Sequence, residues 1–201
     1  MEQKNNKIIL DQKQTDLSKF VKVYDNVIPI QKLQKLLVWL NTVQPNYWEA
    51  GKIGDTGDGG KLDKSFRVVD CLPLCTHHNS MTNVHYTYFF HEVVLQIVRK
   101  YVQDTGIEFH DCNVSQLEIL RYNVGGNYKP HVDASLIYPR RLSFIYFLNN
   151  DYEGGELHFP GIGKIELQPN RCVMWPSGFM YPHGVKPVTK GVRYSLVSWI
   201  N

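Results

Sequence analysis

The second half of the chain consists of short β-rich runs separated by turn residues. After Phe109, eight such runs follow one another at close spacing. Many short strands with frequent turns are typical of a sandwich or a jelly roll. We therefore predict a jelly-roll core. The predicted strands cover residues 116–122, 129–133, 141–149, 155–159, 164–168, 171–175, 182–187 and 193–200.

One of these strands is apolar on both faces. In the run Leu142-Ser-Phe-Ile-Tyr-Phe-Leu148, Ile145 and Phe147 face one side and the other large side chains face the opposite side. A strand that is covered on both sides needs helices on its outer face. Two patterns of helical spacing earlier in the chain, at about Pro29–Val43 and about Thr82–Gly106, can provide that cover.

These patterns predict a single α+β domain over residues 1–201. About 1–110 form an N-terminal helical support region, and about 111–201 form the jelly-roll core, with the helices packed on its larger sheet. The fractions of hydrophobic residues (43%) and charged residues (20%) are close to the globular average. The formal charge of +3 is too small for a dedicated nucleic-acid binder, so we expect no nucleic-acid partner.

The N-terminus and the cysteines bear on the compartment. Within Met1–Asp11 the apolar run Ile8-Ile-Leu10 is too short for a signal peptide or a membrane span. Four cysteines in a chain without a secretion signal are expected to be reduced thiols. We therefore predict a cytoplasmic protein that does not enter a membrane.

Four residues of the C-terminal half suggest a metal site and an acidic ligand. His131 and Asp133 can project from one face of a strand, and His183 follows from a later strand. By chance alone a chain of this composition contains roughly 0.4 His-x-Asp pairs, so the third ligand carries much of the signal. Two imidazoles and one carboxylate form the facial triad of ferrous oxygenases, and Arg193 suggests an acidic co-substrate.

Other interpretations of these residues are open. The three side chains could be ordinary polar residues near strand ends, or they could hold zinc with a water, which would imply hydrolysis and leave Arg193 without a clear role. A separate zinc site at Cys71-x-x-x-Cys75 is disfavoured, because Pro73 interrupts the run and no second thiolate pair completes the ligand set.

From Leu117 to Ile200 the sequence resembles the 2-oxoglutarate- and Fe(II)-dependent dioxygenases, and within them the prolyl 4-hydroxylase-like branch. The first hundred residues match only loosely. The resemblance rests on Leu-Arg-Tyr122, Asn-Tyr128-Lys-Pro-His131-Val-Asp133, Phe-Ile-Tyr-Phe-Leu-Asn149, Tyr-Glu-Gly-Gly-Glu-Leu157, Trp-Pro-Ser177 and His183-Gly-Val-Lys-Pro-Val-Thr-Lys-Gly-Val-Arg193-Tyr-Ser-Leu-Val-Ser-Trp199.

The resemblance implies a double-stranded β-helix in which His131, Asp133 and His183 bind Fe(II) and carry catalysis. It implies 2-oxoglutarate as co-substrate, molecular oxygen as co-reactant and ascorbate as an optional further cofactor. Arg193 would pair with the distal carboxylate of 2-oxoglutarate, which suits a permanently charged guanidinium that can donate two parallel hydrogen bonds. Tyr122 is the second predicted contact to that carboxylate.

One departure from the family affects this co-substrate site. Relatives of the hypoxia-sensing type carry a tyrosine contact where this chain has Phe147. More of the anchoring should then fall on Arg193 and Tyr122, while Phe147 and Ile145 shape the pocket wall. Trp199 is a further predicted residue of the co-substrate site. It should lie on the same face of its strand as Arg193, because six residues separate them, and so beside the co-substrate or the target residue.

Loops are the predicted source of substrate recognition. The candidates are the glycine-rich stretch 51–64 and the segment 134–140, either of which could close as a lid. The expected substrate is a prolyl residue in a peptide or protein. A different side chain, a free amino acid or a nucleobase is the alternative, and a binding module without catalysis is a third. The candidate substrate-binding residues are Tyr128, Tyr138, Arg140 and Arg141.

Overall fold

The computed structural model describes residues 16–54, 59–107 and 111–201. The predictions for Met1–Asp11 and for 55–58 of the glycine-rich stretch therefore lie outside the described residues. The first part of the chain forms two α-helices, two short 3-10 helices and four short strands. These are η1 (Leu17–Phe20), β1 (Lys22–Asp25), α1 (Ile30–Leu40), η2 (Pro45–Tyr47), β2 (Glu49–Ala50), β3 (Arg67–Val68), β4 (Asp70–Leu74) and α2 (Met81–Thr105).

The rest of the described chain forms ten strands. The predicted strand at 155–159 is shorter than expected and is preceded by a separate strand, and the strand β13 has no counterpart in the prediction. The strands are β5 (Val114–Tyr122), β6 (Asn127–His131), β7 (Leu142–Phe147), β8 (Glu153–Gly154), β9 (Leu157–Phe159), β10 (Gly163–Lys164), β11 (Arg171–Pro176), β12 (His183–Val185), β13 (Val188–Lys190) and β14 (Arg193–Ile200).

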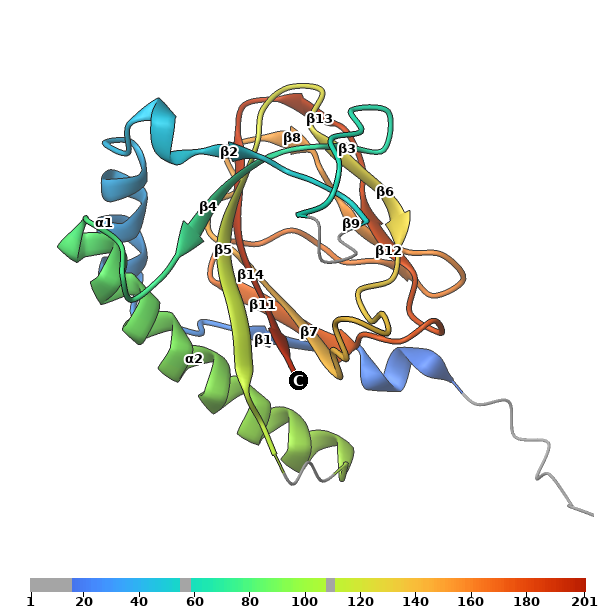
Figure 1. Cartoon of the computed structure of the whole chain (residues 1–201). Helices are drawn as coiled ribbons and strands as arrows, with labels where there is room; N and C mark the ends of the chain where they lie inside the picture. Colours follow the sequence, from blue (N-terminus) through green and yellow to red (C-terminus); the bar gives the residue numbers. More distant parts are fainter. Residues whose placement is uncertain (1–15, 55–58, 108–110) are drawn as a thin grey trace, which may run out of the picture.

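The strands form two facing sheets and a small ribbon. The major sheet has seven strands in the order β1-β11-β7-β14-β5-β4-β2, and the minor sheet has five in the order β10-β9-β12-β6-β3. A two-stranded ribbon joins β13 to β8. Figure 1 shows the two sheets with the helices outside the major one. This is the jelly-roll architecture that the strand pattern predicted and the double-stranded β-helix that the resemblance implied.

Both α-helices begin at local start signals, and α2 also ends at one, whereas α1 ends at Leu40, earlier than the predicted Val43. α1 starts directly after Pro29, and α2 starts after Ser80, whose hydroxyl accepts a hydrogen bond from the Asn83 amide. α2 ends at Gly106, which takes the left-handed conformation with a φ of 69° that favours glycine. Neither helix of the described chain combines the length and apolar composition needed to cross a bilayer.

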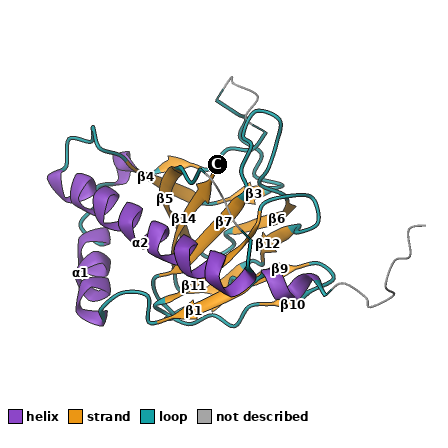
Figure 2. Ribbon diagram, turned by 90° about the horizontal axis from the view of Figure 1, so that it is seen from below, coloured by secondary structure: helices purple, strands orange, loops and turns teal. Residues whose placement is uncertain are grey.

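The double-sided apolar pattern of β7 is explained by layers on both sides. Phe144 and Tyr146 face the helices, and the Tyr146 ring lies 6.0 Å from that of Phe90 on α2. Ile145 and Phe147 belong to a second cluster between the two sheets. Figure 2 shows α2 lying across the outer face of the major sheet. The face of the major sheet that is turned toward the minor sheet is therefore free to form a cavity.

The N-terminal region contributes more than helical support. The segment after the glycine-rich stretch belongs to both sheets, because Arg67–Val68 pairs with β6 in the minor sheet and Asp70–Leu74 pairs with β5 in the major sheet. The chain crosses between the sheets at Val69, which is buried. The prediction missed this because a two-residue strand is too short to show a periodic pattern.

Candidate metal centre and ligand pocket

The minor sheet brings the two predicted histidine ligands together. His131 is the last residue of β6 and His183 is the first residue of β12, and the two are register partners. Asp133 lies beyond the end of β6, so the prediction that it belongs to the same strand as His131 was wrong. The chain leaves the sheet there because the Ala134 amide bonds to the Ser177 carbonyl instead of continuing the β6 ladder.

The three side chains nevertheless point to one spot. The Nε2 atom of His131 lies 3.6 Å from Oδ1 of Asp133, and Nε2 of His183 lies 3.3 Å from Oδ2 of the same carboxylate. One ligand atom from each residue fits within 4.8 Å of the others, which suits a shared metal ion. No other group of three or more such ligands occurs among the described residues, so the alternative zinc site at Cys71 and Cys75 has no support there.

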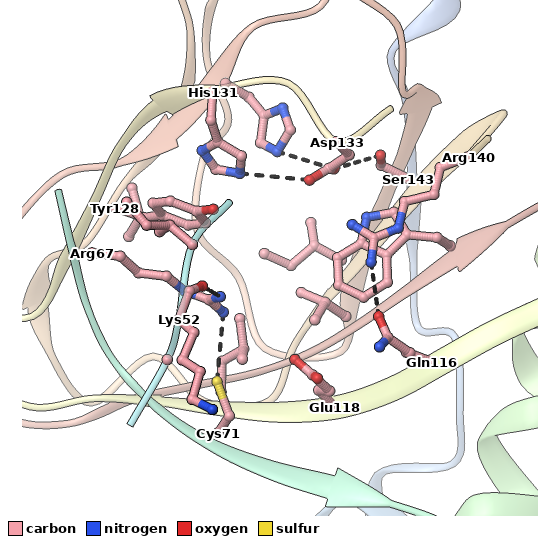
Figure 3. A pocket seen from close by; sticks show the side chains of 18 of the residues that line it. Lys52, Arg67, Cys71, Gln116, Glu118, Tyr128, His131, Asp133, Arg140 and Ser143 are labelled. Atoms are coloured by element: carbon pink, nitrogen blue, oxygen red, sulfur yellow. Dashed lines mark hydrogen bonds and ion pairs between the residues drawn. The ribbon is translucent and has the colours of Figure 1, made fainter. Parts of the chain in front are cut away.

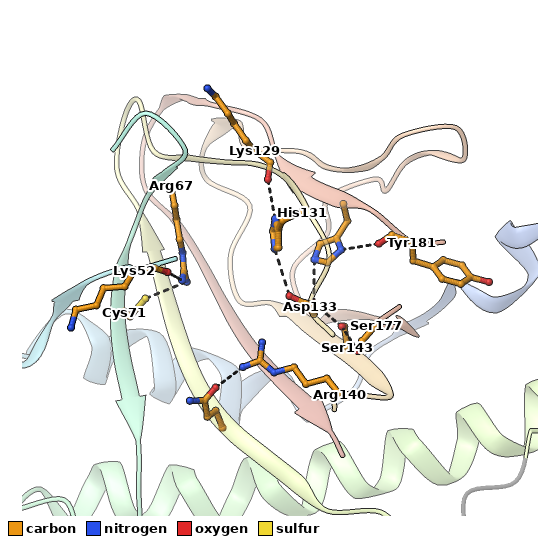
Figure 4. A network of polar contacts seen from close by, with 12 residues as sticks. Lys52, Arg67, Cys71, Lys129, His131, Asp133, Arg140, Ser143, Ser177 and Tyr181 are labelled. Atoms are coloured by element: carbon orange, nitrogen blue, oxygen red, sulfur yellow. Dashed lines mark hydrogen bonds and ion pairs between the residues drawn. The ribbon is translucent and has the colours of Figure 1, made fainter. Parts of the chain in front are cut away.

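Each member of this triad is oriented by a further hydrogen bond (Figure 4). Nδ1 of His131 lies 2.9 Å from the Lys129 carbonyl, and Nδ1 of His183 lies 3.1 Å from the Tyr181 carbonyl. A carbonyl only accepts, so both Nδ1 atoms carry the proton and both Nε2 lone pairs remain available for a metal.

The Asp133 carboxylate is held by a buried serine pair. The Ser143 hydroxyl donates to Oδ2 of Asp133 over 2.6 Å and lies 2.8 Å from the Ser177 hydroxyl. Because Asp133 accepts the Ser143 proton, Ser177 must be the donor to Ser143. These two hydrogen bonds in series fix the Asp133 carboxylate. The direct contact comes from Ser143 on the major sheet, opposite the two histidines of the minor sheet.

The electrostatics of the triad favour the protonation states that bind metal. Burial lowers the pKa of His131, which favours the neutral ring. Burial by itself would raise the pKa of Asp133, but the His183 and His131 rings outweigh it and hold that pKa well below its usual range. A neutral imidazole and an ionised carboxylate are the forms that ligate a cation.

Tyr128 lies against a metal ligand. Its ring stacks on the His131 ring with centroids 3.6 Å apart and planes inclined by 19°. The guanidinium carbon of Arg67 also lies over the Tyr128 ring, 4.7 Å from its centroid. Burial raises the pKa of Tyr128 to about 12, so its hydroxyl keeps its proton. This residue, predicted to bind substrate, also braces the metal ligand.

Arg193 is a buried cation with unused donors. Its side chain is 0% exposed, and only Nη1 has a partner, the Ser195 hydroxyl at 3.2 Å. Nε and Nη2 are buried without a hydrogen-bond partner in the described part of the chain. The guanidinium carbon lies 4.9 Å from the Tyr122 ring and 5.3 Å from the Phe147 ring. Because unpaired donors on a buried guanidinium are costly, this arrangement fits an acidic ligand.

A glycine makes room for this arginine. Gly155 has a φ of 69°, and a Cβ atom there would lie 2.9 Å from Cδ of Arg193. Both the backbone conformation and the close approach favour glycine at this position. Gly155, the second glycine of the Gly-Gly pair, therefore shapes the space around the arginine.

A cavity of about 400 Å³ opens between the sheets and includes the triad in its wall. Figure 3 shows it from close by. Of the other predicted site residues, six contribute to the lining, namely Tyr122, Tyr128, Tyr138, Arg140, Ile145 and Trp199. Arg193 and Phe147 lie behind this lining and are fully buried.

Another part of the cavity wall is formed by Arg140, whose guanidinium packs on the ring of Trp199. The guanidinium carbon of Arg140 lies 3.7 Å from the Trp199 ring centroid, and Nη2 of Arg140 donates to the Gln116 side chain over 2.7 Å. Arg141, by contrast, lies outside the lining, and its Nη1 donates to the Asp111 carbonyl. The structure therefore places the neighbouring arginines in different surroundings.

Some residues of the site had not been predicted. Ser143 and Ser195 hold the metal carboxylate and the arginine, while Arg67 and Glu118 line the cavity. Ser143 could have been noticed as the one small polar residue in the apolar run of its strand. The other three carry no such local signal, because they reach the site through strand pairing.

A two-histidine, one-carboxylate site beside a buried arginine with free donors is what the resemblance led us to expect. Residues 117–201 match the family model of the 2OG-Fe(II) oxygenase superfamily. The resemblance predicted from the sequence is thereby confirmed for this part of the chain. The match covers the triad, Arg193 and Trp199.

Curated relatives match less than half of the chain. A PKHD-type hydroxylase of Synechococcus sp. (strain CC9902) is 40% identical over 94 residues, which are 43% of this chain and 41% of the relative. A PKHD-type hydroxylase of Gloeothece citriformis is 36% identical over 96 residues, 43% of each chain. The chain thus matches about two fifths of the length of these relatives.

Solved structures extend the similarity to nearly the whole fold. A prolyl-4-hydroxylase of Pseudomonas putida has a TM-score of 0.68 at 18% identity, covering 92% of this chain and 95% of its own. A prolyl hydroxylase of Trichoplax adhaerens, solved with a peptide fragment of a hypoxia-inducible factor, has a TM-score of 0.69 at 16% identity, covering 91% and 84%. At these identities the likeness shows a shared fold.

Proposed function

We propose that this chain is an Fe(II)- and 2-oxoglutarate-dependent dioxygenase that hydroxylates a prolyl residue of a peptide or protein. The observation that carries the proposal is the pairing of two groups in one place. A three-ligand metal triad lies in the wall of the cavity, and a buried arginine with two unused donors lies directly behind that wall.

His131, Asp133 and His183 would hold the metal through two Nε2 atoms and one carboxylate, which leaves other coordination positions open. Bound Fe(II) and 2-oxoglutarate supply the oxidative chemistry, in which O₂ is consumed, 2-oxoglutarate becomes succinate and CO₂, and one oxygen atom enters a C–H bond. The protein contributes the orientation of the ligands and the exclusion of water.

Arg193 would bind the distal carboxylate of 2-oxoglutarate with its free Nε and Nη2 donors. Tyr122 would add its hydroxyl from the neighbouring position of β5, which is the register partner of Arg193. Phe147 offers no hydroxyl, so these two residues carry the anchoring. Ile145 and the apolar residues around it would pack against the methylene groups of the co-substrate.

The substrate residue would enter at the Trp199 end of the cavity. A prolyl ring has an apolar face that suits an aromatic wall, and Arg140 and Tyr138 offer polar groups at the rim. The described residues of the glycine-rich stretch, including Lys52 and Ile53, also line the cavity, which supports a role for that stretch in closing over a peptide. The names of the two solved structures reported above favour proline over other targets.

Two steps test this proposal with the same protein. The purified chain is incubated with Fe(II) and 2-oxoglutarate without oxygen, and the metal-to-ligand charge-transfer band is recorded. Oxygen is then admitted with a library of proline-containing peptides, and succinate and hydroxylated peptide are measured. Absence of both the band and succinate would refute the oxygenase, whereas succinate without a hydroxylated proline would move the target to another residue. Ascorbate dependence and a cytoplasmic location stay predictions.

A further inference from the structure

The cavity contains a carboxylate that the proposed reaction does not use. Alternate residues of β5 face the cavity, and Glu118 lies in this row between Gln116 and Leu120. Figure 3 shows Glu118 on the side of the cavity opposite the metal triad, with its carboxylate directed into the cavity. Burial and the charges of neighbouring residues shift the pKa of this group. No side chain or backbone N–H of the described residues donates a hydrogen bond to it. Glu118 is half-buried, and its carboxylate offers open acceptor positions to an N–H group of a ligand in the cavity.

The strand register places Glu118 between the two halves of the site. On β5 and β14, Tyr122 lies opposite Arg193 at the proposed co-substrate end, and Glu118 lies opposite Val197. Trp199 follows two residues later on β14, at the proposed substrate end. The carboxylate therefore stands beside the space where a substrate residue would meet the co-substrate.

Two flanking cations oppose the effect of burial on the pKa of this carboxylate. Burial raises the pKa of Glu118, and the charges of Arg67 and Arg140 oppose this rise. The described hydrogen bonds of these arginines go to other groups, and Nε of Arg67 is buried without a partner among the described residues. Nη1 of Arg67 donates to the Lys52 carbonyl over 2.7 Å, Nη2 of Arg67 lies 3.5 Å from the Cys71 sulfur, and Nη2 of Arg140 donates to Gln116.

The charge balance decides what kind of donor fits. Apart from the metal ligand Asp133, the described residues that line the cavity carry three basic and two acidic side chains. A further cation would enter a region that is already slightly positive, so a neutral N–H group fits better. The residues in this balance are Lys52, Arg67, Arg140, Glu49 and Glu118.

We propose that Glu118 is a specificity-determining residue that accepts a hydrogen bond from a substrate N–H group next to the oxidised residue. This rests on the proposed function. A prolyl residue within a peptide has no N–H of its own, so the nearest donor on its C-terminal side is the amide of the following residue. The site would then select a peptide by its main chain, with a charge-assisted bond that is stronger than a neutral one.

Binding to an inert complex tests the proposal without turnover. The chain is loaded with Mn(II) and 2-oxoglutarate under argon, and Kd is measured for two versions of one peptide from the library. The versions differ only after the proline, where the second has an ester in place of the amide and so lacks the N–H. We expect the ester to bind wild-type protein about tenfold more weakly, and the Glu118→Met variant to bind both versions equally.

Two variants control for indirect effects. Glu118→Gln keeps an acceptor without the charge, so a part of the amide preference should remain. Glu92→Gln makes the same chemical change on an exposed position of α2 and should match wild type. Unchanged 2-oxoglutarate affinity in Glu118→Met shows that its site is intact. If wild type binds the ester as well as the amide, or if Glu118→Met keeps the amide preference, the proposal is overturned.

Free L-proline and L-lysine, measured in the same assay, separate this proposal from the proposed function. If peptides do not bind but an amino acid binds in a manner that depends on Glu118, the N–H acceptor role holds and the peptide substrate is wrong. If peptides are hydroxylated equally well by wild type and Glu118→Met, the function holds and the acceptor role fails. If none of these N–H donors binds wild type while the charge-transfer band forms, the acceptor role is likewise refuted.

Discussion

The metal triad and the buried arginine satisfy their polar groups in different ways. In the triad, each imidazole Nδ1 bonds to a backbone carbonyl, and the Asp133 carboxylate is held by Ser143 and, through it, Ser177. At Arg193, one guanidinium nitrogen has a partner and two have none within the described chain. The second hydrogen bonds of the triad are therefore all formed within the protein, whereas two donors of Arg193 are left for a ligand.

This difference has an energetic consequence. Preformed hydrogen bonds fix the metal ligands and reduce the ordering cost of metal binding. The unpaired donors of Arg193 cost stability in the free protein, and an acidic ligand would remove that cost on binding. Co-substrate binding should therefore stabilise the fold more than its contact area suggests.

Removal of a metal ligand should have the largest effect. We expect His131→Ala to lower turnover by more than about 100-fold, because loss of a ligand should exceed the 10- to 100-fold typical of outer contacts. Metal content and succinate release measure this. His91→Ala, on an exposed position of α2, is the matched control and should change neither. Full metal content and turnover in His131→Ala would remove this residue from the triad.

The arginine end should respond through co-substrate affinity. We expect Arg193→Ala to weaken 2-oxoglutarate binding by about 100-fold, which corresponds to the roughly 3 kcal/mol of a charged hydrogen-bonded pair. Titration of the charge-transfer band gives this value. Arg193→Lys keeps the charge without the two-pronged geometry and should fall between the two proteins. Unchanged affinity in Arg193→Ala would refute the anchor.

Loss of the serine that holds Asp133 should have a smaller effect, on metal affinity. We expect Ser143→Ala to weaken metal binding by about tenfold, because the Asp133 carboxylate loses the hydrogen bond that orients it. Competition with a chelator measures the change. Ser198→Ala is the control, since this serine is equally buried in the major sheet but its hydroxyl has no described partner. Equal metal affinity in both variants would make the Ser143 contact irrelevant to the metal.

The tyrosine beside Arg193 should give the smallest effect. Tyr122→Phe removes only a hydroxyl, so we expect 2-oxoglutarate affinity to fall about fivefold, equivalent to roughly 1 kcal/mol for one hydrogen bond. Tyr146→Phe removes a buried hydroxyl that bonds to Asn170 on the helix side, and it should lower the melting temperature without changing this affinity. A Tyr122→Phe protein with wild-type affinity would leave Arg193 as the sole anchor.

Features with a local signature could be predicted from the sequence. The alternation in β7 predicted which side chains face the helices and which face the cavity, and Phe144 and Ile145 lie as expected. The helical spacing predicted α1 and α2 to within a few residues. His131 and His183 were predicted from short motifs, and the structure brings them together.

Features that depend on pairing between distant segments could not be predicted. Arg67 reaches Tyr128 because β3 pairs with β6, and nothing in its neighbourhood along the chain indicates this. The position of Asp133 beyond its strand depends on a hydrogen bond to the loop around Ser177. Short strands have little periodicity of their own, so their partners decide where they lie.

The sequence by itself determined the chemistry of this protein, through two histidines, one aspartate and one arginine in a jelly-roll pattern. The tertiary structure decided how these groups are completed. It gives each triad residue a hydrogen bond, from a carbonyl or a serine, and it leaves two donors of Arg193 unpaired among the described residues. It also places Glu118 in the cavity whose wall includes the triad. The physical reason is that ligand type is a property of a residue, whereas hydrogen-bond satisfaction and burial arise only when sheets pack together.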